Sequence, residues 1–487
     1  MPFPSSNTWL TLAVAALGLA PAAGALAEEP ASGGPDQILS LKLDPRGLTA
    51  NEVARRAVRT SADVAARRVE VEAAAAVVIQ NAVGFAPRLS FSFSYARLSD
   101  ITPPLFGYSV VAPGVTSGPV PSGAALVSVP QRFPALLNAT TAQALLSVPV
   151  SDYLLRLSQT YTASRRSKRA AELQAQAQQL KVQADARIAF YNWIRAALGE
   201  IVAEQTLTQV QGHLRDVRSS FTQGIASRAD VLRVESQVAV AEGLRERSRN
   251  YRAVAEEQLR TQMHEPVAVP LTAAEDVSQA LPALKLAMSP VLYAEALRAR
   301  PELRALEDTE LSLAEQARAA RAGLWPRLDA FGEVTVQNPN QRYIPPPDEF
   351  DLTWSVGLRL SFAPNDIASA HAQGRVADAR TQQVAAQRAA LVDGVRSEVA
   401  LAVQAVRDAD TAVSTSARGL AASEASYRVR LSLFRVGRAT SVELTDAESD
   451  LLRSRLDAVN ARVDQRIARV RLDRATGRDA LAQGESQ

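Results

Sequence analysis

Alternating apolar and polar side chains run through four short stretches of the chain. The clearest covers residues 350–363, where the apolar positions are Leu352, Trp354, Val356, Leu358, Leu360 and Phe362. Residues 87–99 follow the same rule with Leu89, Phe91, Phe93 and Tyr95. Weaker versions occupy residues 327–338 and 144–151, the latter through Leu146, Val148 and Val150. A period of two predicts four strands, each with one apolar and one polar face.

These apolar faces fit the wall of an outer-membrane β-barrel better than a soluble sheet. A strand of a soluble sheet needs a second layer over its apolar face, and no neighbouring segment supplies one. Transmembrane strands of about 9–11 residues alternate in the same way. Four strands do not close a barrel, and open edges leave backbone groups unpaired in lipid. We therefore expect several copies of the chain to share one barrel.

Most of the remaining sequence is typical of unusually long helices. The stretch from Asp152 to about Ser220 holds no proline, and residues 365–435 are comparable in length. At 1.5 Å per residue, such helices are about 100 Å long. A heptad seam of small and apolar residues then follows, listed as Leu444, Ala447, Leu451, Ser454, Ala458, Ala461, Gln465, Ala468 and Leu472. Two antiparallel helical hairpins per chain predict a rod or the wall of a tube.

One turn sequence occurs twice. The series Phe221, Gly224, Ser227 and Asp230 returns later, at one constant offset, as Phe434, Gly437, Thr440 and Glu443. Upstream, Gly84 and Pro87 return as Gly323 and Pro326, at a second and slightly larger offset. Each half is therefore predicted to run helix, strand, loop, strand, long helix, turn, long helix.

The repeat divides the chain. We expect a first repeat at residues 45–263 with its turn near 221–230, a connector at 264–290, a second repeat at 291–478 with its turn near 434–446, and a C-terminal tail at 479–487. The longer first loop, about 99–143, is rich in proline and glycine. A plug, a lid and a loop without function remain open for it.

The turn residues have a structural interpretation. Gly224 and Gly437 are predicted to end one helix with positive φ. Ser227 and Thr440 then cap the next helix, with Asp230 and Glu443 as the acidic partners of two capping boxes.

Residues 1–27 have the features of a cleaved export signal. They carry no Asp, Glu, Lys or Arg and close with Ala25-Leu26-Ala27, a small-x-small pattern, although the usual basic start is missing. Residues 28–44 are assigned as an N-terminal extension. No later stretch has the roughly 18 consecutive apolar residues of a spanning helix.

Composition leaves little material for catalysis. Cysteine is absent and the only histidines are His213, His264 and His371, so no metal site, cofactor or enzymatic activity is expected. His264-Glu265 lacks the second histidine of a zinc-binding helix. The 54 basic and 51 acidic residues are spread along the chain, which argues against nucleic-acid binding.

The chain resembles the TolC family of outer-membrane efflux proteins. The resemblance rests on the two turns, the Pro-Arg-Leu strand starts at 87–89 and 326–328, and the Leu-x-Val-Pro-Val and Leu-x-Leu-Ser-Phe sequences at 146–150 and 358–362. It covers about residues 45–480. The resemblance implies an α+β membrane protein, a homotrimer whose twelve-stranded barrel takes four strands from each chain and continues as a helical coiled-coil tunnel in the periplasm.

The resemblance also implies roles for individual residues. Glu443 and Asp446 align with acidic positions of a periplasmic aperture, where a ring of carboxylates attracts cations and raises its members' pKa values. Residues expected at the tips, in contact with an adaptor or transporter, are Phe221, Gly224, Ser227, Asp230, Phe434, Gly437, Arg438 and Thr440. Lipid-facing positions are Phe91, Phe93, Tyr95, Trp354, Val356, Leu358, Leu360 and Phe362.

One family feature is missing. A Tyr and an Arg of the second turn bond to the acid of the first turn in the closed family members, but here Phe434 and Ala439 occupy those positions. Arg438 and Arg228 are the candidate substitutes.

The implied function is a passive exit duct in the outer membrane, working with a periplasmic adaptor, an inner-membrane ABC or proton-driven transporter, outer-membrane lipid and an exported substrate. Because the chain lacks a lipid-bearing cysteine, type I secretion of a protein toxin is favoured over efflux of drugs or ions. A periplasmic coiled-coil adaptor or scaffold is the alternative from another class. It leaves the alternating strands unexplained.

Overall fold

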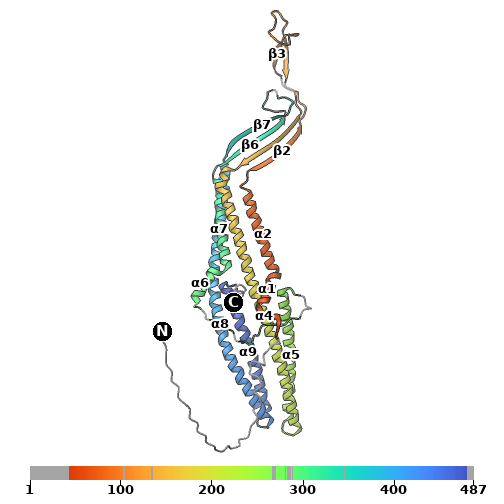
Figure 1. The fold of residues 1–487 in the computed structure, drawn as a ribbon, viewed down its shortest axis with the longest axis vertical. Coiled ribbons are helices and arrows are strands. Elements are labelled where there is room, and N and C mark those ends of the chain that lie inside the picture. The colour runs from red at the N-terminus through yellow and green to blue at the C-terminus, as the bar shows by residue number, and fades with distance from the viewer. Residues whose placement is uncertain are drawn as a thin grey trace, which may run out of the picture.

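The computed structural model describes residues 43–479 except 103–104, 133–134, 266–269, 280, 282–283, 285–286, 288 and 345. The predicted signal at 1–27, nearly all of the extension at 28–44 and most of the tail at 479–487 lie outside the described residues. Figure 1 shows an elongated molecule with a curved sheet toward one end and two hairpin turns at the other.

The first repeat contains most of the predicted elements and some that were not predicted. In order they are β1 (Leu43–Leu48), α1 (Ala50–Thr60), α2 (Ala62–Val83), β2 (Arg88–Arg97), β3 (Leu105–Val111), β4 (Val127–Arg132), β5 (Asn138–Val148), α3 (Val150–Asp152), the π-helical turn η1 (Tyr153–Leu157), α4 (Ser158–Thr222) and α5 (Arg228–Met263). Strand β1 lies before the predicted first helix and was not expected.

The second repeat reproduces the first. It consists of α6 (Ser289–Ala299), α7 (Pro301–Arg321), the 3₁₀ turn η2 (Ala322–Leu324), β6 (Arg327–Asn338), β7 (Asp351–Ser361), α8 (Pro364–Arg435) and α9 (Ser441–Thr476). Both bounds of α6 follow those of α1 at the offset that separates Gly84 from Gly323. Both bounds of β7 and of α9 follow those of β5 and α5 at the offset that separates Gly224 from Gly437. The two offsets found in the sequence are therefore offsets between equivalent structural elements.

The predicted strand at 144–151 is wrong at both ends. Strand β5 begins six residues earlier, at Asn138, and ends at Val148, while Val150 starts helix α3 after Pro149. The early part was missed because Thr140 and Ala142 are small or weakly apolar, which gives little contrast between the two faces of the strand. At the end of β7, Phe362 lies one residue beyond the strand.

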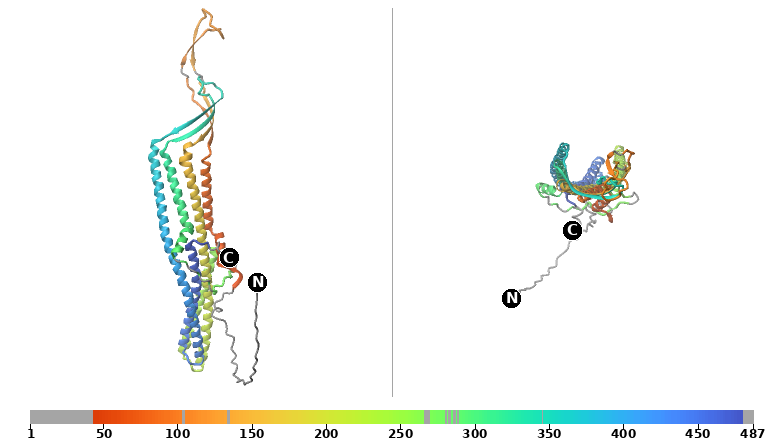
Figure 2. Two further views of the ribbon diagram at one scale, coloured as in Figure 1. Left: turned by 60° about the vertical axis from the view of Figure 1, so that its left-hand side comes forward. Right: turned by 90° about the horizontal axis from the view of Figure 1, so that it is seen from above.

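The segment at 99–143 is not simply a loop. It holds the antiparallel pair β3–β4 and the first six residues of β5. This hairpin extends beyond the four-stranded sheet, away from the helical hairpin turns (Figures 1 and 2). The sequence prediction missed it because Gly107 and Pro130 interrupt the alternation of its short strands.

The main sheet is antiparallel with the strand order β2-β5-β6-β7. Its register aligns the apolar positions of neighbouring strands. Phe93 lies opposite Ala142, Ala142 opposite Val336, and Val336 opposite Leu352. One face of the whole sheet is consequently apolar, as predicted strand by strand, while the other carries Ser, Thr, Gln, Glu and Arg with a few apolar exceptions.

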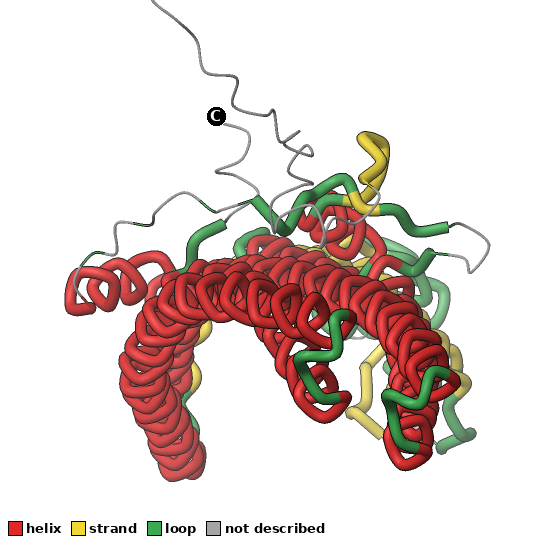
Figure 3. The backbone as a smooth tube through the Cα atoms, turned by 90° about the horizontal axis from the view of Figure 1, so that it is seen from below, coloured by secondary structure: helices red, strands yellow, loops and turns green. Residues whose placement is uncertain are grey.

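The long helices form a curved wall, which Figure 3 shows in end view. Helices α4 and α5 make one antiparallel hairpin, α8 and α9 make the other, and α4 packs directly against α9. Residues of the predicted heptad seam are buried, among them Leu444, Leu451 and Leu472, each at most 1% exposed. The prediction of coiled-coil packing is confirmed for α9.

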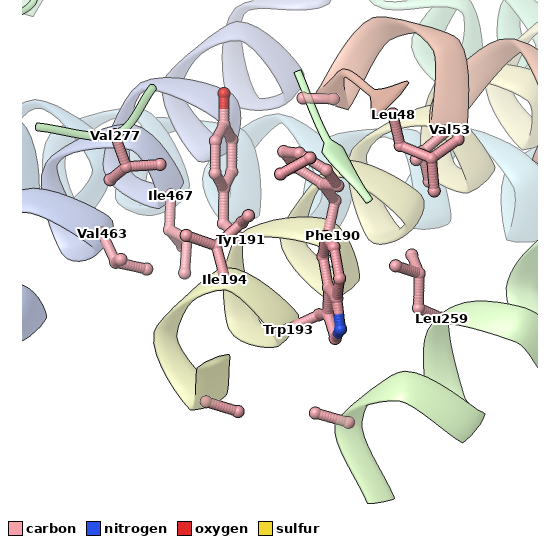
Figure 4. Close-up of a cluster of buried hydrophobic side chains, with 14 of the residues drawn as sticks. Leu48, Val53, Phe190, Tyr191, Trp193, Ile194, Leu259, Val277, Val463 and Ile467 are labelled. Atoms are coloured by element: carbon pink, nitrogen blue, oxygen red, sulfur yellow. The ribbon is translucent and has the colours of Figure 1, made fainter. Parts of the chain in front are cut away.

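The largest buried cluster lies where the two hairpins meet the start of the first repeat. Phe190, Trp193 and Ile194 of α4 pack with Leu259 of α5 and Ile467 of α9 (Figure 4). Helix α1 adds Val53, which is fully buried. This cluster fixes the two hairpins to each other far from their tips.

The connector between the repeats binds across this cluster. The Leu48 N–H donates to the Thr272 carbonyl at 2.7 Å, and the Tyr191 hydroxyl donates to Glu275 Oε1 at 2.9 Å. Arg466 Nη2 of α9 donates to the Gln279 carbonyl at 2.9 Å. Burial raises the pKa of Tyr191, which keeps its hydroxyl a donor. The connector thus links β1, α4 and α9.

Candidate functional site

The two hairpin turns have the same backbone geometry. Gly224 and Gly437 have φ of 73° and 72°, in the left-handed region that glycine tolerates best. No neighbouring atom would touch an added Cβ at either position. The requirement for glycine here is conformational and not a matter of space.

Both predicted capping boxes are confirmed. Ser227 Oγ accepts from the Asp230 N–H at 3.2 Å, and Asp230 Oδ2 accepts from the Ser227 N–H at 3.0 Å. In the second turn Thr440 Oγ1 accepts from the Glu443 N–H at 3.2 Å, and Glu443 Oε2 accepts from the Thr440 N–H at 2.8 Å. These reciprocal bonds start α5 and α9.

The two predicted aperture carboxylates have different surroundings. Glu443 is exposed, and its Oε1 accepts from Arg430 Nη1 of α8 at 2.6 Å. The Thr440 N–H, then the Thr440 hydroxyl and Arg430, lower the pKa of Glu443. In the single chain the pKa of Glu443 is therefore lowered, and not raised as expected for carboxylates that three chains bring together in a ring. Asp446 is exposed, one helical turn further along α9.

Neither candidate substitute for the family latch bonds to Asp230 within the described residues. Asp230 is held by Ser227, whose side-chain and backbone hydrogen bonds lower its pKa, and neither Arg228 nor Arg438 contacts it. Phe434 packs into an apolar cluster of the first hairpin, beside Val217 and Val234. Of the other predicted tip residues, Phe221 is 45% exposed, and Gly224, Ser227, Gly437, Arg438 and Thr440 are also exposed or partly exposed.

Among the contacts between the hairpins that the sequence prediction missed, two involve residues close to the turns. Arg435 Nε of α8 lies 3.4 Å from Asp216 Oδ2 of α4. His213 Nδ1 of α4 lies 3.1 Å from Glu448 Oε2 of α9, and both side chains are buried. A signal for the second contact existed, because His213 continues a heptad series with Thr206, Val210 and Val217.

The predicted lipid-facing residues share one exposed face. Phe91, Phe93, Tyr95, Trp354, Val356, Leu358 and Leu360 are each between 61% and 76% exposed. Phe362, just past the strand, is 51% exposed. These large apolar side chains form one dense exposed patch, whereas soluble proteins normally expose such side chains singly.

The part of the chain that the structure describes offers no cluster of three or more His, Cys, Asp or Glu side chains suited to a metal ion. A helix with enough continuous apolar length to span a bilayer is also absent from these described residues.

Residues 292–478 match the family model described as outer membrane efflux protein. This part of the chain is similar to that family. The match spans the second repeat from α6 to the end of α9. A search of curated protein sequences gave no significant match.

Solved structures extend the fold similarity to nearly the whole chain. The outer-membrane channel OprN is 20% identical, with 91% of this chain and 96% of that chain covered and a TM-score of 0.70. VceC, an outer membrane protein of Vibrio cholerae, is 14% identical, with 88% and 96% covered and a TM-score of 0.69. The MtrE outer membrane channel of Neisseria gonorrhoeae is 17% identical, with 88% and 89% covered and a TM-score of 0.71.

The chain therefore has the TolC-like fold of outer-membrane channels, strands at one end and long helices beyond them. The predicted family resemblance and fold class are confirmed. Family members are channels and not enzymes, in agreement with the prediction of a non-enzymatic protein. The family also supports a location in the outer membrane.

Proposed function

We propose that this protein is one subunit of a homotrimeric channel that gives exported substrates a passive path from the periplasm through the outer membrane. The observation that carries the proposal is the sheet. It has one continuous apolar face, exposed in the chain, and two edge strands, β2 and β7. In lipid those edges need partners, which further copies of the same four strands supply.

The helices support the same assembly. Helix α9 is buried on two sides, by α8 and by α4, whereas its equivalent α5 is buried mainly by α4. Leu232 and Val254 of α5 are 55% and 54% exposed, while their equivalents Thr445 and Ile467 of α9 are 6% and 4% exposed. The exposed face of α5 therefore corresponds to a face of α9 that packs against another helix, but within the described chain no helix covers it.

The exposed face of α8 in a neighbouring chain is proposed to pack against this face of α5. Ser426 and Ala422 of α8 are the equivalents of His213 and Gln209, through which α4 contacts α9. Both are exposed and small, so a helix from a neighbouring chain packs closely there. Packing α5 of one chain on α8 of the next repeats the α9–α4 contact and closes a ring when the rotation between copies permits.

In this assembly the hairpin turns meet around one axis at the periplasmic end. Glu443 and Asp446 from three chains form an acidic ring that favours cations. The exposed tip residues, with Phe221 and Arg438 among them, are the surface for a periplasmic adaptor or an inner-membrane transporter. The transporter supplies the energy, and the duct itself performs no chemistry.

The cargo is proposed to be a secreted protein toxin of a type I system. The support is the absence of cysteine, and hence of a lipid-bearing one, from the sequence. Efflux of drugs or ions is the second candidate, and the efflux description of the matching family favours it. Capture of the transporter by crosslinking from position 221 or 438 in cells distinguishes the two.

Purified protein in a planar bilayer tests the duct. We expect cation-selective conductance, and weaker cation preference in the Glu443→Gln/Asp446→Gln variant. Unchanged selectivity in that variant would remove the ring assignment. The Glu70→Gln/Glu72→Gln variant, which removes two exposed carboxylates of α2 far from the hairpin turns, is the matched control and keeps the preference.

A cysteine pair tests the subunit contact, because the natural chain contains no cysteine to interfere. Glu235→Cys with Ser426→Cys is expected to crosslink three chains into one covalent species. Gln237→Cys with Arg428→Cys points the two thiols to the opposite helix faces, and it should give monomers. Equal crosslinking by both pairs would contradict the proposed packing.

A further inference from the structure

A buried polar cluster joins the two helical hairpins near their turns. His213 of α4 is 2% exposed and Glu448 of α9 is 4% exposed, with Nδ1 and Oε2 separated by 3.1 Å. On the other side of the imidazole, Ser441 Oγ lies 3.4 Å from Nε2. The ring of Phe434 meets the imidazole edge to face, with 5.2 Å between centroids.

The cluster is not a requirement of the turn. The other hairpin has the same turn and similarly long helices, yet the residue equivalent to His213 is the exposed Ser426. Glu235, the equivalent of Glu448, is bonded by Arg218 of its own hairpin at 2.7 Å. The second repeat therefore uses Glu448 for a buried contact with the other hairpin, whereas the first repeat uses the equivalent Glu235 for a surface ion pair within its own hairpin.

Some polar atoms of this buried cluster lack hydrogen bonds. Glu448 Oε1 and the nearby Thr445 Oγ1 are buried without a hydrogen-bond partner among the described residues. Two apolar side chains of similar volume would hold the helices together at least as well, because a buried carboxylate loses its hydration. With the polar pair, the strength of the contact between the two helices therefore depends on the charges of His213 and Glu448.

Both acidic and basic side chains lie around the His213–Glu448 pair. Helix α4 brings Asp216, paired with Arg435 of α8, and α8 brings Glu424 and Tyr427. Helix α9 adds Arg455, which bonds Gln209 at 3.5 Å, and burial lowers the pKa of Arg455. Burial and then Glu448 raise the pKa of Tyr427 to about 12, so the phenol is neutral. Helix α5 contributes apolar groups, Val231 and Val234, to the adjoining cluster.

We infer that His213 and Glu448 form a proton-operated joint between the two hairpins of each chain. A neutral imidazole donates one hydrogen bond but leaves the buried carboxylate without a counter-charge. A proton taken up by His213 completes an ion pair and favours the state in which the hairpins are joined. Histidine is the side chain that changes charge between pH 5 and 8. Acidification therefore holds the hairpins together, and neutral pH loosens them.

This inference rests on the proposed duct, because the joint lies beside the turns that surround its periplasmic end. The test is the steady conductance of the reconstituted trimer between pH 5.5 and 7.5. We expect wild-type conductance to fall by roughly threefold or more on acidification. His213→Gln and Glu448→Gln should lose that component. His371→Gln, at an exposed histidine of α8, should keep it.

A second variant guards against misfolding. His213→Leu with Glu448→Met fills the joint with apolar groups of similar size and should assemble as a trimer whose conductance no longer follows pH in this window. Wild-type-like pH dependence in the assembled double variant would overturn the joint. Correctly assembled wild-type trimers without any conductance would instead overturn the proposed duct, so the two failures are distinguishable.

Discussion

The two helical hairpins of this chain share caps and turns but differ in what covers them. Helices α5 and α9 each have 36 residues and each begins with a capping box. Each also ends at a residue in the left-handed conformation, His264 after α5 and Gly477 after α9. Yet α9 is packed on two sides within the chain, and α5 presents one of the corresponding sides to solvent. Local sequence therefore determines the shape of a hairpin, and its neighbours determine which faces are buried.

The largest expected effect comes from breaking the packing on the second hairpin. Leu451→Ala removes a side chain that is 1% exposed, which should destabilise α9 by about 2–5 kcal/mol. Leu232→Ala on the free face of α5 should leave hairpin stability nearly unchanged while weakening the association of subunits. Hydrogen exchange of the two helices and the thermal dissociation of the trimer measure the two effects separately. A large loss of local protection in Leu232→Ala would mean that this face is already packed within the chain.

Substitution of the turn glycines sharpens the comparison, because here the hairpins should respond equally. Gly224→Ala and Gly437→Ala each place a Cβ on a backbone of positive φ, at a cost of about 1–2 kcal/mol. Hydrogen exchange in the first turns of α5 and α9 reports the cost. Gly394→Ala, inside α8 and with open space around the added Cβ, is the control and should stabilise slightly. Unequal losses at the two turns would show that one turn is supported by contacts beyond its own hairpin.

The smallest effect is the response of the two caps to acid. Hydrogen bonds from Ser227 lower the pKa of Asp230, and those from Thr440 lower the pKa of Glu443. Because the folded-state pKa lies below the unfolded value, each cap contributes fully above the ordinary carboxyl range and is lost as pH falls through the lowered pKa. Exchange of the Asp230 and Glu443 amides between pH 5 and 3, corrected for intrinsic rates, checks this. Asp230→Asn and Glu443→Gln should abolish the pH-dependent part, because they remove the titrating carboxylates, and a cap strengthened by acid would contradict the assignment.

Much of this architecture could be predicted because it is encoded locally. Alternation placed β6 at its observed bounds, and the Gly-x-x-Ser/Thr spacing gave both turns and both caps. The offset between the two turns would also have corrected the misplaced strand β5, since moving β7 back by that offset gives the observed range. Where apolar contrast was weak, at Thr140 and Ala142, the pattern failed.

The contacts between hairpins could not be predicted in the same way. His213 and Glu448 are 235 positions apart, and their contact depends on how α4 and α9 pack against each other in three dimensions. The same holds for Arg466, whose bonds to connector carbonyls follow no sequence period. The candidate joint was therefore found from burial and distance, whereas the candidate ring was found from spacing and family resemblance.

The unequal length of the two repeats has a practical consequence. The first repeat is longer between its two sheet strands, and the additional chain forms the β3–β4 ribbon, which leaves β5 and α5 in register with β7 and α9. If the sheet spans the outer membrane as proposed, this ribbon faces the medium around the cell. A foreign peptide inserted at its apex, near Gly118, would be displayed on living cells while the tunnel beneath keeps its geometry.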